Sequence, residues 1–172
     1  MHITKILSFI VTMTFLLFSC IKDDESETIN YINVNSQIPT FAVEDTAGNT
    51  FSSKQFIGKQ SLLVFFGTYC PDCKQILPVI EEVWKELKDD PRFLLVMISR
   101  KETAEVVSNY WKENQFTMPF YLDTRGEVFS LFANNTIPRI YIINPDNEVV
   151  WMAVESLDIS AKELIQKIKG LK

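Results

Sequence analysis

Two cysteines separated by two residues are the part of this sequence best suited to chemistry. Cys70 and Cys73 form the segment Cys-Pro-Asp-Cys, which follows the apolar run 61–66 and precedes a helical pattern that extends to residue 89. At this spacing the sulfurs can bond across one helical turn, and the dipole and free N–H groups of a first turn favour an anion. Because the thiolate is the attacking form, we expect Cys70 to be the nucleophile and the deeper Cys73 to resolve the mixed disulfide.

The residue inventory limits the alternatives for this pair. The chain has three cysteines and one histidine, His2, whereas a structural zinc site needs four ligands. A purely structural disulfide remains possible because an exported protein can keep one, but a loop this short stabilises little through chain entropy. The pair is therefore predicted to be redox-active and to hold no metal.

Length and charge set the broad class. A chain of 172 residues that is 47% hydrophobic and 23% charged suits one domain with an ordinary core and short appendages. The net charge of −5 argues against nucleic acid as a partner, because such binding needs basic stripes.

The first 35 residues are predicted to be an export and anchoring segment. Residues 1–19 combine a basic Lys5 with an apolar run that is shorter than the roughly 20 residues of a membrane-spanning helix, as in a signal peptide. The ending Leu-Phe-Ser-Cys at Cys20 resembles a bacterial lipobox, which implies a lipid on this cysteine. An ordinary signal or a membrane anchor with an incidental Cys20 is the alternative. Residues 20–35 then form the lipidated cysteine and a flexible polar tether, and the domain spans 36–172.

Hydrophobic periodicity predicts a mixed α/β domain. A hairpin is expected over 41–51, followed by strands at 61–66 and 93–99, helices up to 89 and over 102–114, a short helix at 127–133, a second hairpin from strands 139–143 and 148–152, and a final helix opened by the capping box 160–163. Strands separated by helices pair in parallel through right-handed crossovers, and the late hairpin adds antiparallel strands. The expected fold is therefore a mixed central sheet with helices on both faces and an N-terminal β-hairpin.

The chain from residue 37 to about 170 resembles the TlpA/ResA-like, AhpC/TSA-type branch of the thioredoxin family. The segment 65–74 resembles a thioredoxin active site, and further matches are the motif 38–41, the turn 45–49, Gly58-Lys59, Pro78 and the segment Thr136-Ile137-Pro138-Arg139. The resemblance implies a thioredoxin-like fold, no metal or organic cofactor, disulfide exchange with protein thiols, and a membrane electron donor that recharges an exported reductant.

Pro138 is the expected centre of the substrate-binding loop. Bonds before proline tolerate the cis form, and together with the Cys-Pro-Asp-Cys segment this favours a cis Ile137–Pro138 bond over a trans proline that opens an edge strand. The resemblance places the loop beside Cys70 and implies that the backbone of Ile137 pairs with the substrate chain as an added strand. We expect Tyr69, Pro71 and Asp72 to complete the substrate-binding surface.

Two departures from the family concern the proton of Cys73. Val64 and Ile76 stand where thioredoxin and some ResA-like proteins carry an acid. Asp72, water, or a carboxylate from residues 100–135 would have to take that role. Glu102 itself, next to Lys101, is predicted to be an exposed surface residue.

The predicted function is a membrane-tethered thiol-disulfide oxidoreductase, acting as a monomer on protein thiols and disulfides at the periplasmic or outer face of the cell envelope. A reductant is favoured because Pro71 donates no hydrogen bond and an ionised Asp72 would repel a Cys70 thiolate, unless Lys74 or Arg139 offsets its charge. One alternative is a peroxiredoxin-like peroxidase, although Thr68 is two rather than three residues before Cys70 and Leu63 replaces the expected proline. The other is a non-catalytic binding module that has kept the fold.

Overall fold

The computed structural model describes residues 27–155 and 158–171. The predicted signal peptide, Cys20 and the first part of the tether lie outside the described residues. The elements, in chain order, are β1 (Ala42–Glu44), β2 (Thr50–Ser52), the 3-10 helix η2 (Ser53–Phe56), β3 (Gln60–Phe66), α2 (Pro71–Leu87), β4 (Phe93–Arg100), α3 (Ala104–Asn114), β5 (Tyr121–Asp123), the 3-10 helix η3 (Phe129–Leu131), β6 (Arg139–Ile143), β7 (Val149–Val154) and α4 (Ala161–Lys169).

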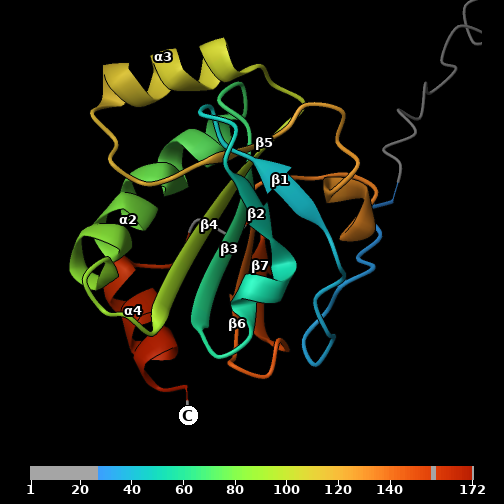
Figure 1. Cartoon of the computed structure of the whole chain (residues 1–172), viewed down its shortest axis with the longest axis vertical. Coiled ribbons are helices and arrows are strands. Elements are labelled where there is room, and N and C mark those ends of the chain that lie inside the picture. Colours follow the sequence, from blue (N-terminus) through green and yellow to red (C-terminus); the bar gives the residue numbers. More distant parts are fainter. Residues whose placement is uncertain (1–26, 156–157, 172) are drawn as a thin grey trace, which may run out of the picture.

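A seven-stranded mixed sheet in the order β2-β1-β5-β4-β3-β6-β7 forms the centre of the domain (Figure 1). β3, β4 and β5 are parallel, whereas β1, β6 and β7 join through antiparallel pairs. β3 lies between two strands and has helices or loops over both faces, so all seven of its residues are buried. The thioredoxin-like α/β fold predicted from the sequence is confirmed.

The two faces of the sheet are covered differently. Phe66 packs on Trp111 of α3, with ring centroids 5.0 Å apart, and Gln60, on the same face, donates a hydrogen bond to the carbonyl of Leu171 beyond α4. The steps β3-α2-β4 and β4-α3-β5 move in one direction across the sheet, so right-handed crossovers place α2 and α3 on the same side. On the opposite face η3 packs against Phe65 of β3, so the helices predicted on both faces are α-helices on one face and this short 3-10 helix on the other.

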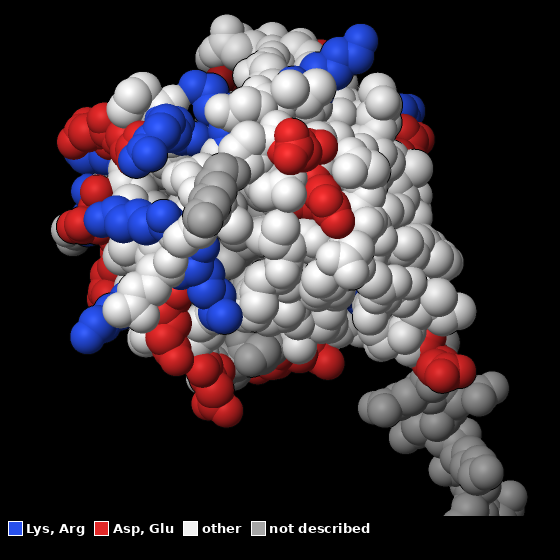
Figure 2. All heavy atoms as spheres, turned by 90° about the horizontal axis from the view of Figure 1, so that it is seen from below, with Lys and Arg blue, Asp and Glu red and all other residues white. Residues whose placement is uncertain are grey.

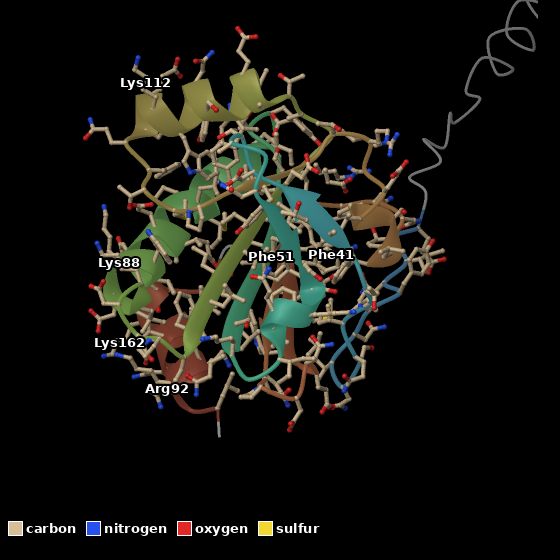
Figure 3. The ribbon with its side chains drawn as sticks, viewed as in Figure 1. Phe41, Phe51, Lys88, Arg92, Lys112 and Lys162 are labelled. Carbon is tan, nitrogen blue, oxygen red and sulfur yellow. The ribbon has the colours of Figure 1, made fainter. Side chains whose placement is uncertain are left out.

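An aromatic cluster fills this opposite face. Phe65 of β3 contacts Phe129 of η3 and Phe132, with centroids 5.5 and 4.7 Å away. Phe41 and Phe51, labelled in Figure 3, extend the cluster across the hairpin, with centroids 6.2 Å apart. Edge-to-face and tilted ring pairs of this kind add about 0.5–1.5 kcal/mol each beyond the burial of their area. The cluster holds the hairpin and η3 against the end of the sheet where the cysteines lie.

The N-terminal segment differs from the prediction of a free tether up to residue 35. Asn30 forms an isolated antiparallel bridge with Ala133, and the backbone N–H of Tyr31 donates to the carbonyl of Phe132 at 2.9 Å. Figure 1 shows this blue segment alongside the orange chain around η3. Backbone hydrogen bonds to a loop far away in the sequence hold this segment in place. Such bonds need no buried apolar stripe, so the segment shows no hydrophobic period.

Charged side chains form no stripe on the face seen in Figure 2, where Lys and Arg alternate with Asp and Glu. Lys88, Arg92, Lys112 and Lys162 stand at the outer surface in Figure 3. Among the described residues, no helix is both long enough and apolar enough to cross a membrane.

Candidate active site

Cys70 and Cys73 lie just after β3, at the start of α2. This is the edge of the sheet formed by the carboxyl ends of its parallel strands. Cys70 is the N-cap of α2 in an extended backbone conformation, and its Sγ accepts a hydrogen bond from the N–H of Cys73 at 3.3 Å. Pro71 occupies the first helical position, where no N–H is needed. The cap geometry therefore aims a backbone donor of the first turn at the Cys70 sulfur, where it stabilises a thiolate.

The two thiols have different access to solvent. Cys70 is partly exposed, whereas Cys73 is completely buried. Burial raises the pKa of the Cys73 thiol far above its ordinary value, and its hydrogen bond with Cys70 raises it further. At neutral pH Cys73 is thus a protonated thiol that no bulky reagent reaches, and Cys70 is the thiol that a substrate can contact.

The raised pKa of Cys73 has a consequence for the stability of the reduced protein. In the unfolded chain this thiol ionises near pH 8.5, but in the folded protein it stays protonated well above that pH. This thiol therefore leaves the free energy of unfolding unchanged below about pH 8.5. Above that pH it lowers the free energy of unfolding by up to about 1.4 kcal/mol per pH unit. We expect urea unfolding of the reduced protein between pH 8 and 10 to show this loss.

The matched control for this pH dependence is the reduced Cys73→Ala variant, which lacks the titrating thiol but keeps every other group that ionises in that range. Its stability should fall less steeply than that of the wild type over the same pH interval. Identical slopes for the two proteins would show that Cys73 ionises as readily in the folded state as in the unfolded chain.

Tyr69 and Ile137 form an apolar rim beside Cys70. A Cβ added to Gly67 would lie 2.6 Å from Cε1 of Tyr69 and 3.0 Å from Cδ1 of Ile137, so both side chains pack closely over this glycine. Tyr69 nevertheless remains 56% exposed. Glycine is needed at 67 because any side chain there would displace Tyr69 and Ile137, and the exposed ring of Tyr69 offers a substrate an apolar surface next to the nucleophile.

The loop before β6 faces the nucleophile from the other side. The Ile137–Pro138 peptide bond is cis, the isomer expected from the sequence, and the Cys70 thiol donates to the carbonyl of Ile137 at 3.4 Å. The expectation that Arg139 could offset the charge of Asp72 is wrong. Arg139 is fully buried, and its guanidinium donates to the carbonyls of Asn135 and Thr136 and to Oδ1 of Asn30. Pro71 is exposed and Asp72 partly exposed beside the cysteines.

Glu102 is a buried carboxylate behind the active-site loop, and the prediction of an exposed residue is wrong. Only 9% of it is exposed, and it accepts hydrogen bonds from the backbone N–H of Thr68 at 2.9 Å, from the Thr68 hydroxyl at 2.5 Å and from the Ser99 hydroxyl at 2.7 Å. Phe66 and Ser99 are register partners in β3 and β4, so the residues just beyond them meet at one edge of the sheet. A prediction that β3 and β4 pair in parallel could have located this carboxylate, because it places the residues after the two strands next to each other.

The surroundings of the cysteine pair differ from those of a metal centre or an enclosed pocket. Within the residues that the structure describes, no group of three or more His, Cys, Asp or Glu side chains could hold a metal ion. A cavity of about 230 Å³ is lined by residues 42–44, Thr50 and residues 122–125 and 127–128, and none of the cysteines or loop residues named above borders it. Cys70 is partly exposed and its neighbour Tyr69 largely so, which leaves the Cys70 thiol accessible to a protein substrate.

Comparisons with known proteins agree with this geometry. The AhpC/TSA family model matches residues 34–152. The thiol-disulfide oxidoreductase ResA of Bacillus subtilis is 30% identical over 119 residues, which are 69% of this chain and 66% of that protein, so the match spans about two thirds of its length. ResA of Oceanobacillus iheyensis is 27% identical over 162 residues, or 92% of this chain and 82% of that protein. A putative protein disulfide isomerase from Bacteroides thetaiotaomicron superposes with a TM-score of 0.76 at 26% identity, covering 81% of this chain and 90% of that one.

Proposed function

The chain belongs to the AhpC/TSA family as a thiol-disulfide oxidoreductase of the ResA type, and we propose that it reduces disulfide bonds of proteins in the cell envelope through Cys70 and Cys73. The observation that carries the proposal is the asymmetry of the pair. An accessible Cys70 receives a backbone N–H from the first turn of α2, and a buried, protonated Cys73 stands behind it.

The reaction follows from this arrangement. The Cys70 thiolate attacks one sulfur of a substrate disulfide, and the other sulfur leaves as a thiolate that takes up a proton. Cys73 then loses its proton and attacks Cys70 Sγ, which releases the second substrate thiol. The enzyme is left with a Cys70–Cys73 disulfide, and two electrons have passed to the substrate. A thiol donor must return two electrons and two protons before the next cycle.

The charges around the cysteines favour electron flow from the protein to its substrate. An ionised Asp72 beside the cysteines disfavours a Cys70 thiolate, and the Arg139 guanidinium is engaged by Asn30 and by the backbone before Ile137. A less stabilised thiolate makes the dithiol the better electron donor. The Thr68 hydroxyl donates a hydrogen bond to Glu102. Its proton is therefore not available to bind a peroxide, which supports protein disulfides over peroxide as the substrate.

Reduction of insulin disulfides tests the proposed activity. The pre-reduced protein should transfer two electrons per molecule to insulin in a single turnover, and a thiol donor should support repeated turnover. Consumption of hydrogen peroxide at a comparable rate, with no reduction of insulin, would favour the peroxidase alternative. No transfer to either substrate would favour a binding module.

The proposed location is the outer side of the membrane, with a lipid on Cys20 as the anchor. Six residues, 21–26, separate Cys20 from Glu27, and six extended residues reach about 20 Å. Glu27 and Thr28 are already bonded to the loop that precedes Ile137. Such an anchor would keep the cysteine pair near the membrane, where a membrane-bound thiol donor can reduce it.

Replacing Cys20 by alanine should release the protein from the membrane fraction or leave an uncleaved precursor. The reason is that the thioether needs the thiol of Cys20 and cleavage follows lipidation. Membrane fractionation and mass spectrometry of the mature chain check this. Unchanged fractionation of Cys20→Ala, together with a wild-type chain that carries no lipid mass, would rule out the anchor while leaving the redox activity untouched.

A further inference from the structure

We propose that residues 27–32, which we call the N-terminal arm, position the loop that receives the substrate. The inference rests on the proposed function, since it concerns how a protein disulfide is held beside Cys70. It adds an element of the site that lies more than a hundred residues away in the sequence from the loop that it holds.

The arm is joined to the chain before Ile137 by a ladder of hydrogen bonds. The side-chain amide of Asn134 both accepts and donates a hydrogen bond. Its Oδ1 accepts from the N–H of Ile29 at 2.8 Å, and its Nδ2 donates to the carbonyl of Glu27 at 2.9 Å. The N–H of Asn134 also donates to the carbonyl of Ile29, and the N–H of Tyr31 donates to that of Phe132. The arm therefore pairs with residues 132–134 much as a short edge strand does.

Arg139, which follows the cis peptide, links the arm to the two residues before Ile137. Its Nη1 donates to Oδ1 of Asn30 at 2.6 Å, while Nε and Nη2 donate to the carbonyls of Thr136 and Asn135 at 2.8 and 2.9 Å. This side chain is completely buried, so each N–H group needs an acceptor from the protein. Asn30 supplies the acceptor for Nη1, and its loss would loosen the guanidinium that holds the loop.

Thr136 connects the arm to the substrate-binding residue. It has a φ of 74°, a left-handed conformation that a β-branched residue adopts only when its surroundings hold it there. Its hydroxyl lies 2.9 Å from that of Thr28, and its carbonyl accepts from Arg139. The next residue is Ile137, whose carbonyl lies 3.4 Å from Cys70 Sγ. Contacts made by the arm thus end one residue before Ile137, the residue whose carbonyl contacts the nucleophile.

A loop that is held before the substrate arrives loses less freedom on binding, which strengthens binding without changing the chemistry of the thiol. Undocking the arm should therefore raise KM for a protein disulfide and leave the reactivity of Cys70 toward a small reagent unchanged. This split distinguishes positioning of the substrate from general damage to the fold, which would affect both measurements.

The test uses Asn30→Ala and Asn134→Ala in the full chain, with KM for insulin and the rate of Cys70 alkylation by iodoacetamide as the two readouts. We expect KM to rise by roughly fivefold or more, as for the loss of about one hydrogen bond, and alkylation to stay within about twofold of wild type. Asn30→Asp, which keeps an acceptor for Arg139, should retain the wild-type KM. Asn33→Ala is the matched control, because the Asn33 side-chain amide donates within the N-terminal segment, to the carbonyl of Asn30, and among the described residues has no hydrogen bond to residues 132–136 or Arg139.

Thr28→Val provides a milder variant if either alanine variant fails to fold, since it removes only the exposed contact with Thr136. An unchanged KM in the variants that fold would overturn the inference, as would an equal loss of alkylation rate. If the wild type itself does not reduce insulin, the proposed function has failed, and that result is distinct from a wild type that reduces insulin as well as its variants do.

Discussion

Replacing Cys70 by serine should lower the rate of disulfide reduction by roughly 10³-fold or more, because a serine hydroxyl stays protonated and cannot replace the attacking thiolate. Cys70 is the partly exposed member of the pair, and its Sγ lies 3.4 Å from the carbonyl of the proposed substrate-binding residue Ile137. The measurement is single-turnover reduction of insulin by the pre-reduced variant.

Cys73→Ser is the matched control for Cys70→Ser. This variant keeps the nucleophile, so it should still attack the substrate, but it lacks the thiol that releases the mixed disulfide. A covalent complex between Cys70 and the substrate should therefore accumulate and disappear when a thiol reductant is added. Turnover by Cys70→Ser, or a mixed disulfide on Cys73 in place of Cys70, would reverse the roles assigned to the two cysteines.

Replacing Glu102 by alanine should destabilise the protein by about 3–5 kcal/mol. The change leaves three donors without their acceptor, namely the N–H and hydroxyl of Thr68 and the hydroxyl of Ser99, and each buried donor without a partner costs about 1–3 kcal/mol. Urea unfolding of the oxidised protein gives the difference directly.

Two further variants bracket the Glu102 prediction. Glu105→Ala removes an exposed carboxylate from the first turn of α3 and should cost less than about 1 kcal/mol. Glu102→Gln should lie between the two, because an amide can accept through its oxygen but presents an N–H₂ group to the remaining donors. A loss for Glu102→Ala no larger than that for Glu105→Ala would mean that the carboxylate does not hold the active-site loop.

The parts of the site that the sequence predicted are those with a local pattern. The place of Cys70 and Cys73 at the start of a helix that follows a buried strand could be predicted, because an apolar run and a helical period flank them. The cis Ile137–Pro138 bond follows from the nature of proline combined with the cysteine segment. β3 and α2 were predicted within a few residues, because a buried strand and an amphipathic helix both show continuous periodicity.

The parts that escaped prediction depend on partners far away in the chain. Glu102 belongs to a residue type that is seldom buried, and only the register of β3 with β4 brings Thr68 to it. The N-terminal arm is polar and aperiodic, and it is ordered by bonds to residues 132–136 and to Arg139. β5 has three residues and no period of its own, so its place beside β4 comes entirely from the sheet. In each case the determining contact is tertiary.

Glu102 and Arg139 each hold one of the two loops that meet at the Cys70 sulfur. Glu102 holds Thr68, two residues before Cys70, and Arg139 holds the carbonyls that lead to Ile137. Each is buried, and each is satisfied by neutral donors or acceptors among the described residues rather than by an opposite charge in contact. Together these contacts fix the loop that carries Cys70 and the loop that leads to Ile137, whose carbonyl lies 3.4 Å from Cys70 Sγ.

The redox potential of the Cys70–Cys73 pair tests the central claim most directly. The protein is equilibrated with glutathione or dithiothreitol buffers of graded potential, quenched with acid, and alkylated so that the reduced fraction can be counted. We predict one two-electron transition with a potential near that of thioredoxin, about −270 mV, because the negative charge of Asp72 beside the cysteines works against a Cys70 thiolate. A potential near −120 mV, typical of a strong oxidant, or cysteines that show no shared transition, would contradict the account of this protein as a disulfide reductant.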